Sequence, residues 1–157
     1  REAKKQGIHT CLDTSGIMYR KERQQEFEKL FDVLDLVLLD FKHSNEEEHK
    51  NLTGLSQKHV LEFAEALEKA EVPMVVRHVV VPGITDQKEH LNNLGKLLAG
   101  FKNIKGLEVL PYHTMGKAKY EKMGLPYPLE NTENMDAEKA REARNIILRA
   151  FQEQRRI

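Results

Sequence analysis

The chain has 157 residues, and its 25 basic and 25 acidic side chains give a formal net charge of zero. This balance argues against the basic surface with which proteins bind nucleic acids or membrane surfaces. We find no apolar run of bilayer length and no signal-peptide pattern, and we expect neither nucleic acid nor membrane as a partner. The length fits a single domain over residues 1–157. The one cysteine, Cys11, excludes an internal disulfide and fits a reducing compartment, so a cytoplasmic location is expected.

The first third of the chain predicts a short helix, a strand, a helix and a strand. Residues 1–6 followed by Gly7 are typical of a helix end. A helix end without a helix start indicates a longer protein, with a frayed natural N-terminus as the alternative. Residues 8–13 predict a strand, and residues 24–34 a helix with apolar side chains at 3.6-residue spacing. The apolar run 36–41 predicts a strand buried on both faces of a parallel sheet.

The middle of the chain continues this alternation. Ser44 and Glu47 form a capping-box pattern for a short helix that Gly54 ends. Ser56 begins the next helix, and residues 74–81 predict a β-branched strand.

The last part adds two helices and a strand. Asp86, with Glu89 three residues later, predicts a helix start, and residues 107–112 predict the fourth strand. Residues 113–135 are expected to be irregular, and Asp136 begins a final helix. Strands that alternate with helices of crossover length predict right-handed βαβ units. The predicted fold class is therefore α/β, with a parallel sheet that is either open or part of a (β/α) barrel. We expect its first strand to be an unpaired edge.

Charged and polar residues stand at the end of each predicted strand, where parallel α/β proteins bind ligands. Asp40 and Lys42 are two residues apart, so they point to the same face and suit a zwitterionic ligand. A local salt bridge explains this pair equally well. Arg77 in a strand interior requires a partner or a ligand, whereas His78 points to the opposite face. Cys11 is expected to be a small core residue.

Two further strand-end residues have simple structural explanations when taken alone. Asp13 could cap the following helix or form a turn, and His113 could be a solvated loop side chain. The sequence contains no phosphate-binding glycine loop, HExxH motif or nucleophile elbow.

The strand ends taken together resemble the pyruvate formate-lyase activating enzymes, a glycyl-radical-activating family of the radical SAM superfamily. The resemblance lies in four collinear segments, HTCLDTSG (9–16), LVLLDFK (36–42), RHVVVPG (77–83) and LPYH (110–113). It continues through residues 115–124 and covers nearly the whole chain.

The resemblance implies a partial TIM-type (β/α) barrel of which this chain supplies the later units. The N-terminal region of that family carries a CxxxCxxC motif for a 4Fe–4S cluster, which this chain lacks, so the chain alone is expected to be inactive. The implied activity of the whole protein is reductive cleavage of S-adenosyl-L-methionine (SAM). The resulting 5′-deoxyadenosyl radical abstracts hydrogen from a glycine of the partner. The implied partners are a glycyl-radical enzyme of anaerobic metabolism, first of all pyruvate formate-lyase, and a reduced flavodoxin or ferredoxin.

The resemblance also implies roles for individual residues. SAM would be bound by Asp40, Phe41, Lys42 and His113. Arg77 would face the cavity that receives the substrate. A monovalent cation beside the cofactor would be held by Asp13, Asp40 and the backbone of Thr14 and Leu38. Two other functions remain open at this point, a non-catalytic α/β interaction domain and a barrel enzyme that uses Lys42, Asp40 and His113 directly.

Overall fold

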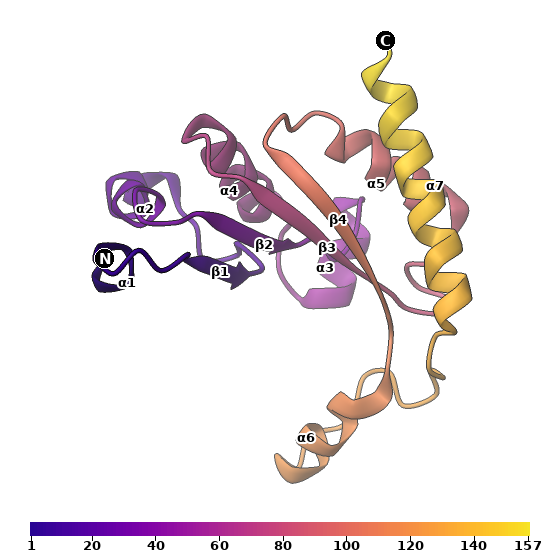
Figure 1. The fold of residues 1–157 in the computed structure, drawn as a ribbon. Coiled ribbons are helices and arrows are strands. Elements are labelled where there is room, and N and C mark those ends of the chain that lie inside the picture. Colours follow the sequence, from indigo (N-terminus) through magenta and orange to yellow (C-terminus); the bar gives the residue numbers. More distant parts are fainter.

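The computed structural model describes residues 1–157 and contains one parallel sheet with helices along its length (Figure 1). The strands, in spatial as well as chain order, are β1 (Cys11–Thr14), β2 (Leu36–Asp40), β3 (Met74–Val80) and β4 (Ile104–Pro111). The α-helices are α1 (Glu2–Lys5), α2 (Gln24–Phe31), α3 (Glu46–Thr53), α4 (Lys58–Lys69), α5 (Lys88–Leu98), α6 (Lys117–Lys122) and α7 (Ala137–Arg155). Two 3₁₀ turns, η1 (Lys21–Arg23) and η2 (Thr114–Gly116), precede α2 and α6. The predicted α/β class and the parallel sheet are confirmed, and β1 is an edge strand as expected.

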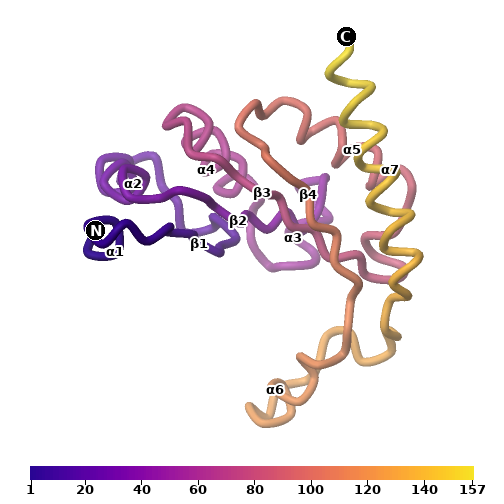
Figure 2. The backbone as a smooth tube through the Cα atoms, viewed as in Figure 1, coloured from indigo at the N-terminus to yellow at the C-terminus, as the bar shows by residue number.

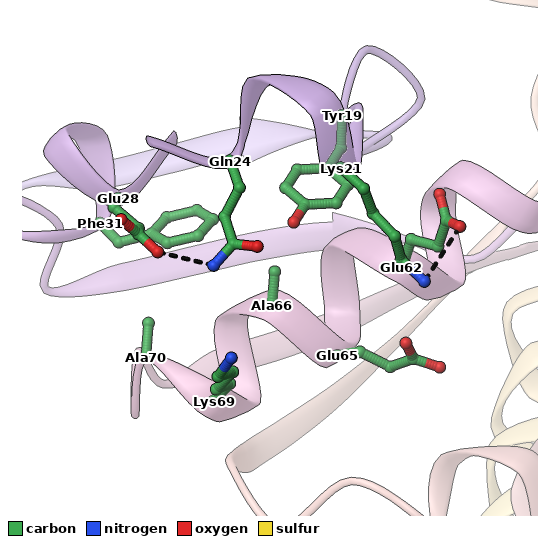
Figure 3. A pocket seen from close by; sticks show the side chains of 10 residues that line it. All are labelled: Tyr19, Lys21, Gln24, Glu28, Phe31, Glu62, Glu65, Ala66, Lys69 and Ala70. Atoms are coloured by element: carbon green, nitrogen blue, oxygen red, sulfur yellow. Dashed lines mark hydrogen bonds and ion pairs between the residues drawn. The ribbon is translucent and has the colours of Figure 1, made fainter. Parts of the chain in front are cut away.

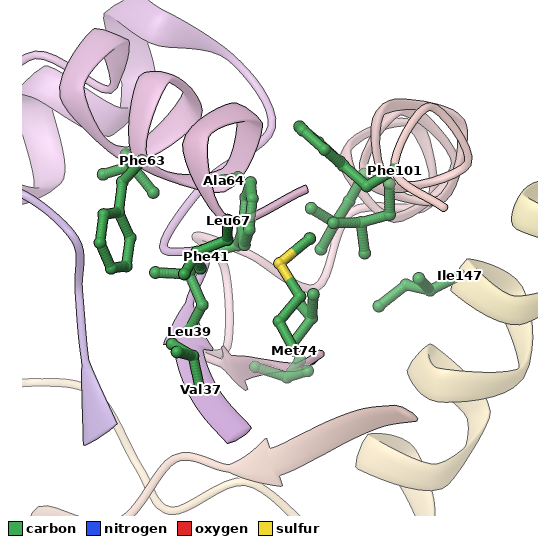
Figure 4. Close-up of a cluster of buried hydrophobic side chains, with 14 of the residues drawn as sticks. Val37, Leu39, Phe41, Phe63, Ala64, Leu67, Met74, Phe101 and Ile147 are labelled. Atoms are coloured by element: carbon green, nitrogen blue, oxygen red, sulfur yellow. The ribbon is translucent and has the colours of Figure 1, made fainter. Parts of the chain in front are cut away.

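The core lies between one face of the sheet and the helices α4, α5 and α7 (Figure 4). Side chains that alternate along the strands point into it, and the fully enclosed ones include Val37, Leu39, Met74 and Val76. Phe63 and Leu67 of α4 and Ile147 of α7 cover them from the helix side. Burial of this apolar area is the dominant stabilising contribution to the fold.

The opposite face of the sheet is only partly covered. Leu36, Leu38 and Val75 are half-buried there, whereas their neighbours along each strand are fully buried. The prediction that residues 36–41 form a strand buried on both faces is therefore wrong for these 157 residues. The apolar run correctly located the strand, but no helix of this chain covers its second face.

Two predictions for the N-terminal edge strand, one of its start and one of the burial of Cys11, differ from the structure. β1 begins at Cys11 instead of residue 8, because the preceding backbone bonds elsewhere: Thr10 donates its N–H to the Asp35 carboxylate at 2.8 Å. Cys11 is exposed, so its assignment to the core is wrong. Its place in register with Leu36 puts it on the uncovered face of an edge strand.

Helix caps differ in two places from the sequence pattern. Asn45, not Ser44, caps α3, since its side-chain oxygen accepts from the N–H groups of Glu47 and Glu48. The carboxylate of Asp86 accepts from the N–H of Gly83 in the turn after β3, and α5 begins only at Lys88. At α7 the prediction is confirmed, because Asp136 accepts from two N–H groups of the first turn.

The segment between β4 and α7 extends away from the sheet and the other helices (Figure 2). It contains η2 and α6, so the expectation of a wholly irregular stretch from residue 113 to 135 is wrong. One anchor of this segment is the hydroxyl pair of Tyr112 and Tyr127, 2.7 Å apart. No helix of the structure has both the length and the apolar character needed to cross a membrane.

Candidate functional site

A network of ion pairs crosses the uncovered face of the sheet and is centred on Arg77. The strand register sets Asp40, Arg77 and Glu108 side by side on β2, β3 and β4. The guanidinium lies 2.5 Å from Asp13 and 3.8 Å from both Asp40 and Glu108. Asp40 in turn accepts from Lys42 at 2.8 Å. The Asp40–Lys42 pair is thus a local salt bridge, and both residues also line a cavity.

The environment of Arg77 favours its charged form. Its side chain is 24% exposed, and burial alone would lower the pKa of the guanidinium, but the carboxylates of Asp13, Asp40 and Glu108 raise that pKa overall. The family resemblance implied a monovalent cation beside the two aspartates, which agrees with the repulsion expected between two carboxylates. In the structure the Arg77 guanidinium supplies positive charge at this place. Its Nε atom is enclosed and has no hydrogen-bond partner.

The backbone positions assigned to the cation lie beside this network. Leu38 of β2 is in register with Asp13 of β1, and the hydroxyl of Thr14 accepts from the N–H of Gly16 at 3.0 Å. Gly16 has a φ of +69°, and a Cβ there would lie 2.7 Å from the Phe63 ring. The turn after β1 therefore requires glycine, and this turn fixes Thr14 at the end of the strand.

Phe41 and His113 lie apart from the ion-pair network. The Phe41 side chain is fully buried on the helix side of the sheet, the face opposite to Asp40 and Lys42. His113 follows β4, is exposed, and makes no hydrogen bond or ion pair with Asp13, Asp40 or Lys42. The structure thus gathers three of the four strand-end residues, together with Arg77.

Glu108 belongs to the network and was missed in the sequence. A usable signal was present, because Leu107 and Val109 pack on the core and strand alternation points Glu108 to the other face. Only the pairing of Glu108 with Arg77 in the sheet shows that the ion-pair network lies on this face.

A chain of hydrogen bonds through two buried histidines supports the loop that follows Lys42. Nε2 of His90 lies 3.3 Å from Nε2 of His78, and Nδ1 of His78 lies 2.7 Å from the carbonyl oxygen of Phe41. On the other side, Nδ1 of His90 is 2.8 Å from the Ser44 hydroxyl and 3.3 Å from the Ser44 N–H. The His43 ring stacks on His90 at 4.0 Å.

The hydrogen-bond partners at the two ends of this histidine chain, the Phe41 carbonyl and the Ser44 N–H, determine which ring nitrogens carry protons. A carbonyl only accepts, so His78 donates through Nδ1, and a backbone N–H only donates, so His90 accepts through Nδ1. When both rings are neutral, the proton between them belongs to Nε2 of His90. Burial lowers the pKa of His78 to about 4, and burial with the neighbouring His78 and His43 lowers the pKa of His90 to about 3. Both rings are therefore neutral near pH 7.

Two cavities border these residues, and another lies between two helices. One of about 150 Å³ is lined by Asp40, Lys42 and His49, and one of about 510 Å³ lies over His43 and His90. The third, of about 330 Å³, is a charged groove between α2 and α4 (Figure 3). Of these three cavities, only the first is lined by the strand-end residues Asp40 and Lys42.

Comparisons with known proteins show the family to which the chain belongs. The sequence model of the Radical SAM superfamily matches residues 1–94. The chain is 43% identical over 147 residues to the pyruvate formate-lyase-activating enzyme of Streptococcus mutans, covering 92% of this chain and 56% of that protein. It is 41% identical over 149 residues to the enzyme of the same name from Staphylococcus epidermidis, covering 94% and 59%. The chain thus spans little more than half the length of these relatives.

Solved structures show the same fold at low sequence identity. A domain of pyruvate-formate lyase-activating enzyme from Bacteroides vulgatus superposes with a TM-score of 0.72 at 19% identity, covering 95% of this chain and 81% of that one. A radical SAM methyltransferase from Sphaerobacter thermophilus gives 0.65 at 12% identity, covering 92% and 40%. These likenesses fit part of a TIM-type barrel. Since the superfamily model covers more than half of its residues, the chain belongs to the radical SAM superfamily.

Proposed function

We propose that this chain is part of a radical SAM activase that forms a glycyl radical on pyruvate formate-lyase. The observation that carries the proposal is the gathering of Asp13, Asp40, Lys42 and Arg77 on the uncovered face of the sheet. Relatives that carry the activating-enzyme name at 41–43% identity support the choice among radical SAM functions.

The residues at the strand ends fit the charges of SAM. Its amino acid end carries a carboxylate, for which the Lys42 ammonium provides three donors and a positive charge. Its ammonium, sulfonium and ribose hydroxyls suit the carboxylate of Asp40. The monovalent cation and the contacts of Phe41 and His113 remain part of the proposal.

The chain does not fit a 4Fe–4S cluster by itself. Such clusters are held by several cysteine thiolates, and Cys11 is the one cysteine of the chain. We therefore place the cluster ligands outside these 157 residues and expect the isolated chain to be inactive. When bound, the cluster and SAM supply the radical chemistry, whereas the residues described here bind and orient the cofactor.

Two partner proteins belong to the proposal. Pyruvate formate-lyase presents the glycine that must reach the cofactor. A reduced flavodoxin or ferredoxin is the proposed electron donor. An oxygen-sensitive cluster requires a reducing compartment, so the proposed location is the cytoplasm.

The alternative of a Schiff-base lysine is less compatible with the geometry. A Schiff base requires the lysine nitrogen to attack a carbonyl, whereas in the structure the Lys42 nitrogen donates to the Asp40 carboxylate at 2.8 Å.

The test uses the product of the complete reading frame, purified without oxygen and loaded with iron and sulfide. With SAM, a reductant and pyruvate formate-lyase, we expect the electron paramagnetic resonance doublet of a glycyl radical. Lys42→Ala should weaken SAM binding in calorimetry at unchanged iron and sulfide content. Lys69→Ala, in the groove between α2 and α4, is the matched control. No glycyl radical with the wild-type protein, or unchanged SAM affinity in Lys42→Ala, would contradict the proposal.

A further inference from the structure

His49 is a buried histidine on a helix whose other side chains are mostly exposed. It lies in α3, is 2% exposed, and lines the cavity of about 150 Å³ together with Asp40 and Lys42. α3 follows β2 directly, so its position depends on the loop that carries Lys42.

The hydrogen bonds of the His49 ring define which nitrogen is available. Nδ1 lies 2.9 Å from the carbonyl oxygen of Leu55, which only accepts, so Nδ1 carries the proton. In the neutral ring Nε2 is then an acceptor. Nε2 has no partner within the chain and is not among the enclosed atoms without partners, so it borders open space.

The ring is held in place by more than one contact. The Thr53 hydroxyl donates to the His49 carbonyl at 2.8 Å and lies 3.3 Å from Nδ1. Gly54, with a φ of +76°, ends α3 and turns the chain so that the Leu55 carbonyl reaches the ring. These contacts fix the orientation of the ring, so Nε2 remains an acceptor at the cavity that a ligand donor can reach.

The size of the cavity restricts what can enter it. Pockets that enclose a whole drug-sized ligand measure about 300–1,000 Å³. A cavity of about 150 Å³ therefore takes one part of a larger ligand, and the rest must lie over the uncovered face of the sheet.

We infer that Nε2 of His49 accepts a hydrogen bond from a ribose hydroxyl of the adenosyl ligand that Asp40 and Lys42 bind. This inference rests on the proposed function. Within the ligand, the carboxylate pairs with Lys42, and the ammonium prefers a carboxylate partner over a neutral ring. The ribose hydroxyls are neutral donors, which suit an uncharged acceptor beside the Asp40–Lys42 pair. His49 is thus a binding residue that positions the sugar relative to the amino acid end.

The experiment compares two probes on the full-length protein by calorimetry. SAM carries both the sugar and the amino acid end, whereas 5′-methylthioadenosine has the sugar and base without the carboxylate and ammonium. Lys42→Ala should weaken SAM alone. His49→Asn keeps a donor for the Leu55 carbonyl but lacks Nε2, so it should weaken both probes about tenfold, the effect of one lost hydrogen bond. His49→Gln places an amide oxygen near the Nε2 position and should recover much of this affinity.

The outcomes separate the two proposals. Wild-type protein that fails to bind SAM would overturn the proposed function and this inference with it. If SAM binds and Lys42→Ala weakens it, but His49→Asn leaves both probes unchanged or weakens SAM alone, only the role of His49 is overturned. If the His49 variants do not fold, the ¹⁵N resonance of Nε2 in the wild-type protein provides the test. It should shift on addition of 5′-methylthioadenosine, and an unchanged resonance would overturn the inference.

Discussion

The guanidinium of Arg77 in β3 lies 2.5 Å from a carboxylate oxygen of Asp13 in β1, although β2 separates the two strands. The long side chain thus crosses the uncovered face of β2 and connects the edge strand to the centre of the sheet. Three carboxylates, those of Asp13, Asp40 and Glu108, surround this one guanidinium. Its removal would leave like charges facing one another.

We predict that Arg77→Met lowers the free energy of unfolding by about 1 kcal/mol at neutral pH, the upper range for partly exposed ion pairs. The loss should shrink at high ionic strength, because salt screens the repulsion among the carboxylates. Urea denaturation at two salt concentrations measures both effects. Asp13→Asn in the Arg77→Met background should be less harmful than in the wild type, as a double-mutant cycle would show. Additive effects would mean that the pair is not coupled.

The histidine chain predicts a loss of stability in mild acid. His78 and His90 have folded pKa values of about 4 and about 3, below the value near 6.5 expected for unfolded histidine. The unfolded state therefore binds more protons between these values, so stability is complete above about pH 6.5 and falls as the pH drops toward 4. Each ring contributes a slope on the order of 1.4 kcal/mol per pH unit.

Thermal unfolding between pH 7 and pH 4.5 measures this slope. His78→Phe should flatten it, although the variant should be less stable at pH 7 because the Phe41 carbonyl loses its donor. His9→Phe, which replaces an exposed ring, is the control and should keep the wild-type slope. An unchanged slope in His78→Phe would remove the assignment.

The contact between α5 and α7 depends on a residue without a side chain. A Cβ at Gly95 would collide with the backbone oxygen of Ile147 and lie 2.8 Å from the Cβ of Ala150. We predict that Gly95→Val destabilises the protein by about 1–3 kcal/mol through overpacking. Gly100→Ala is the milder control, because the nearest atom to its added Cβ is 3.4 Å away. Equal midpoints of urea denaturation for the two variants would contradict the close packing.

The exposed thiol of Cys11 predicts ready chemical modification. It lies at the start of the edge strand on the uncovered face, so a thiol reagent such as Ellman's reagent should label the native chain at one equivalent without denaturant. Labelling that requires denaturant would mean that other residues cover this edge in the protein tested. Comparison of this chain with the full-length protein would then locate the covering surface.

The alternation of strands and helices could be predicted from the sequence, because apolar periodicity and turn residues are local properties of the chain. The sequence also placed Asp40 and Lys42 on one face, since side chains two apart on a strand always share a face. The family was visible for the same reason, as each matching segment is a single strand with its following turn.

Which charged side chains contact one another could not be predicted from the sequence and depends on the folded arrangement. The ion pair of Asp13 and Arg77, the contribution of Glu108 and the histidine chain from Ser44 to Phe41 join residues that are far apart in sequence. Their partners depend on strand register and helix packing, which no local pattern encodes. The same holds for the start of α3. Asn45 caps this helix in place of the predicted Ser44, whose hydroxyl instead contacts His90 of the later helix α5.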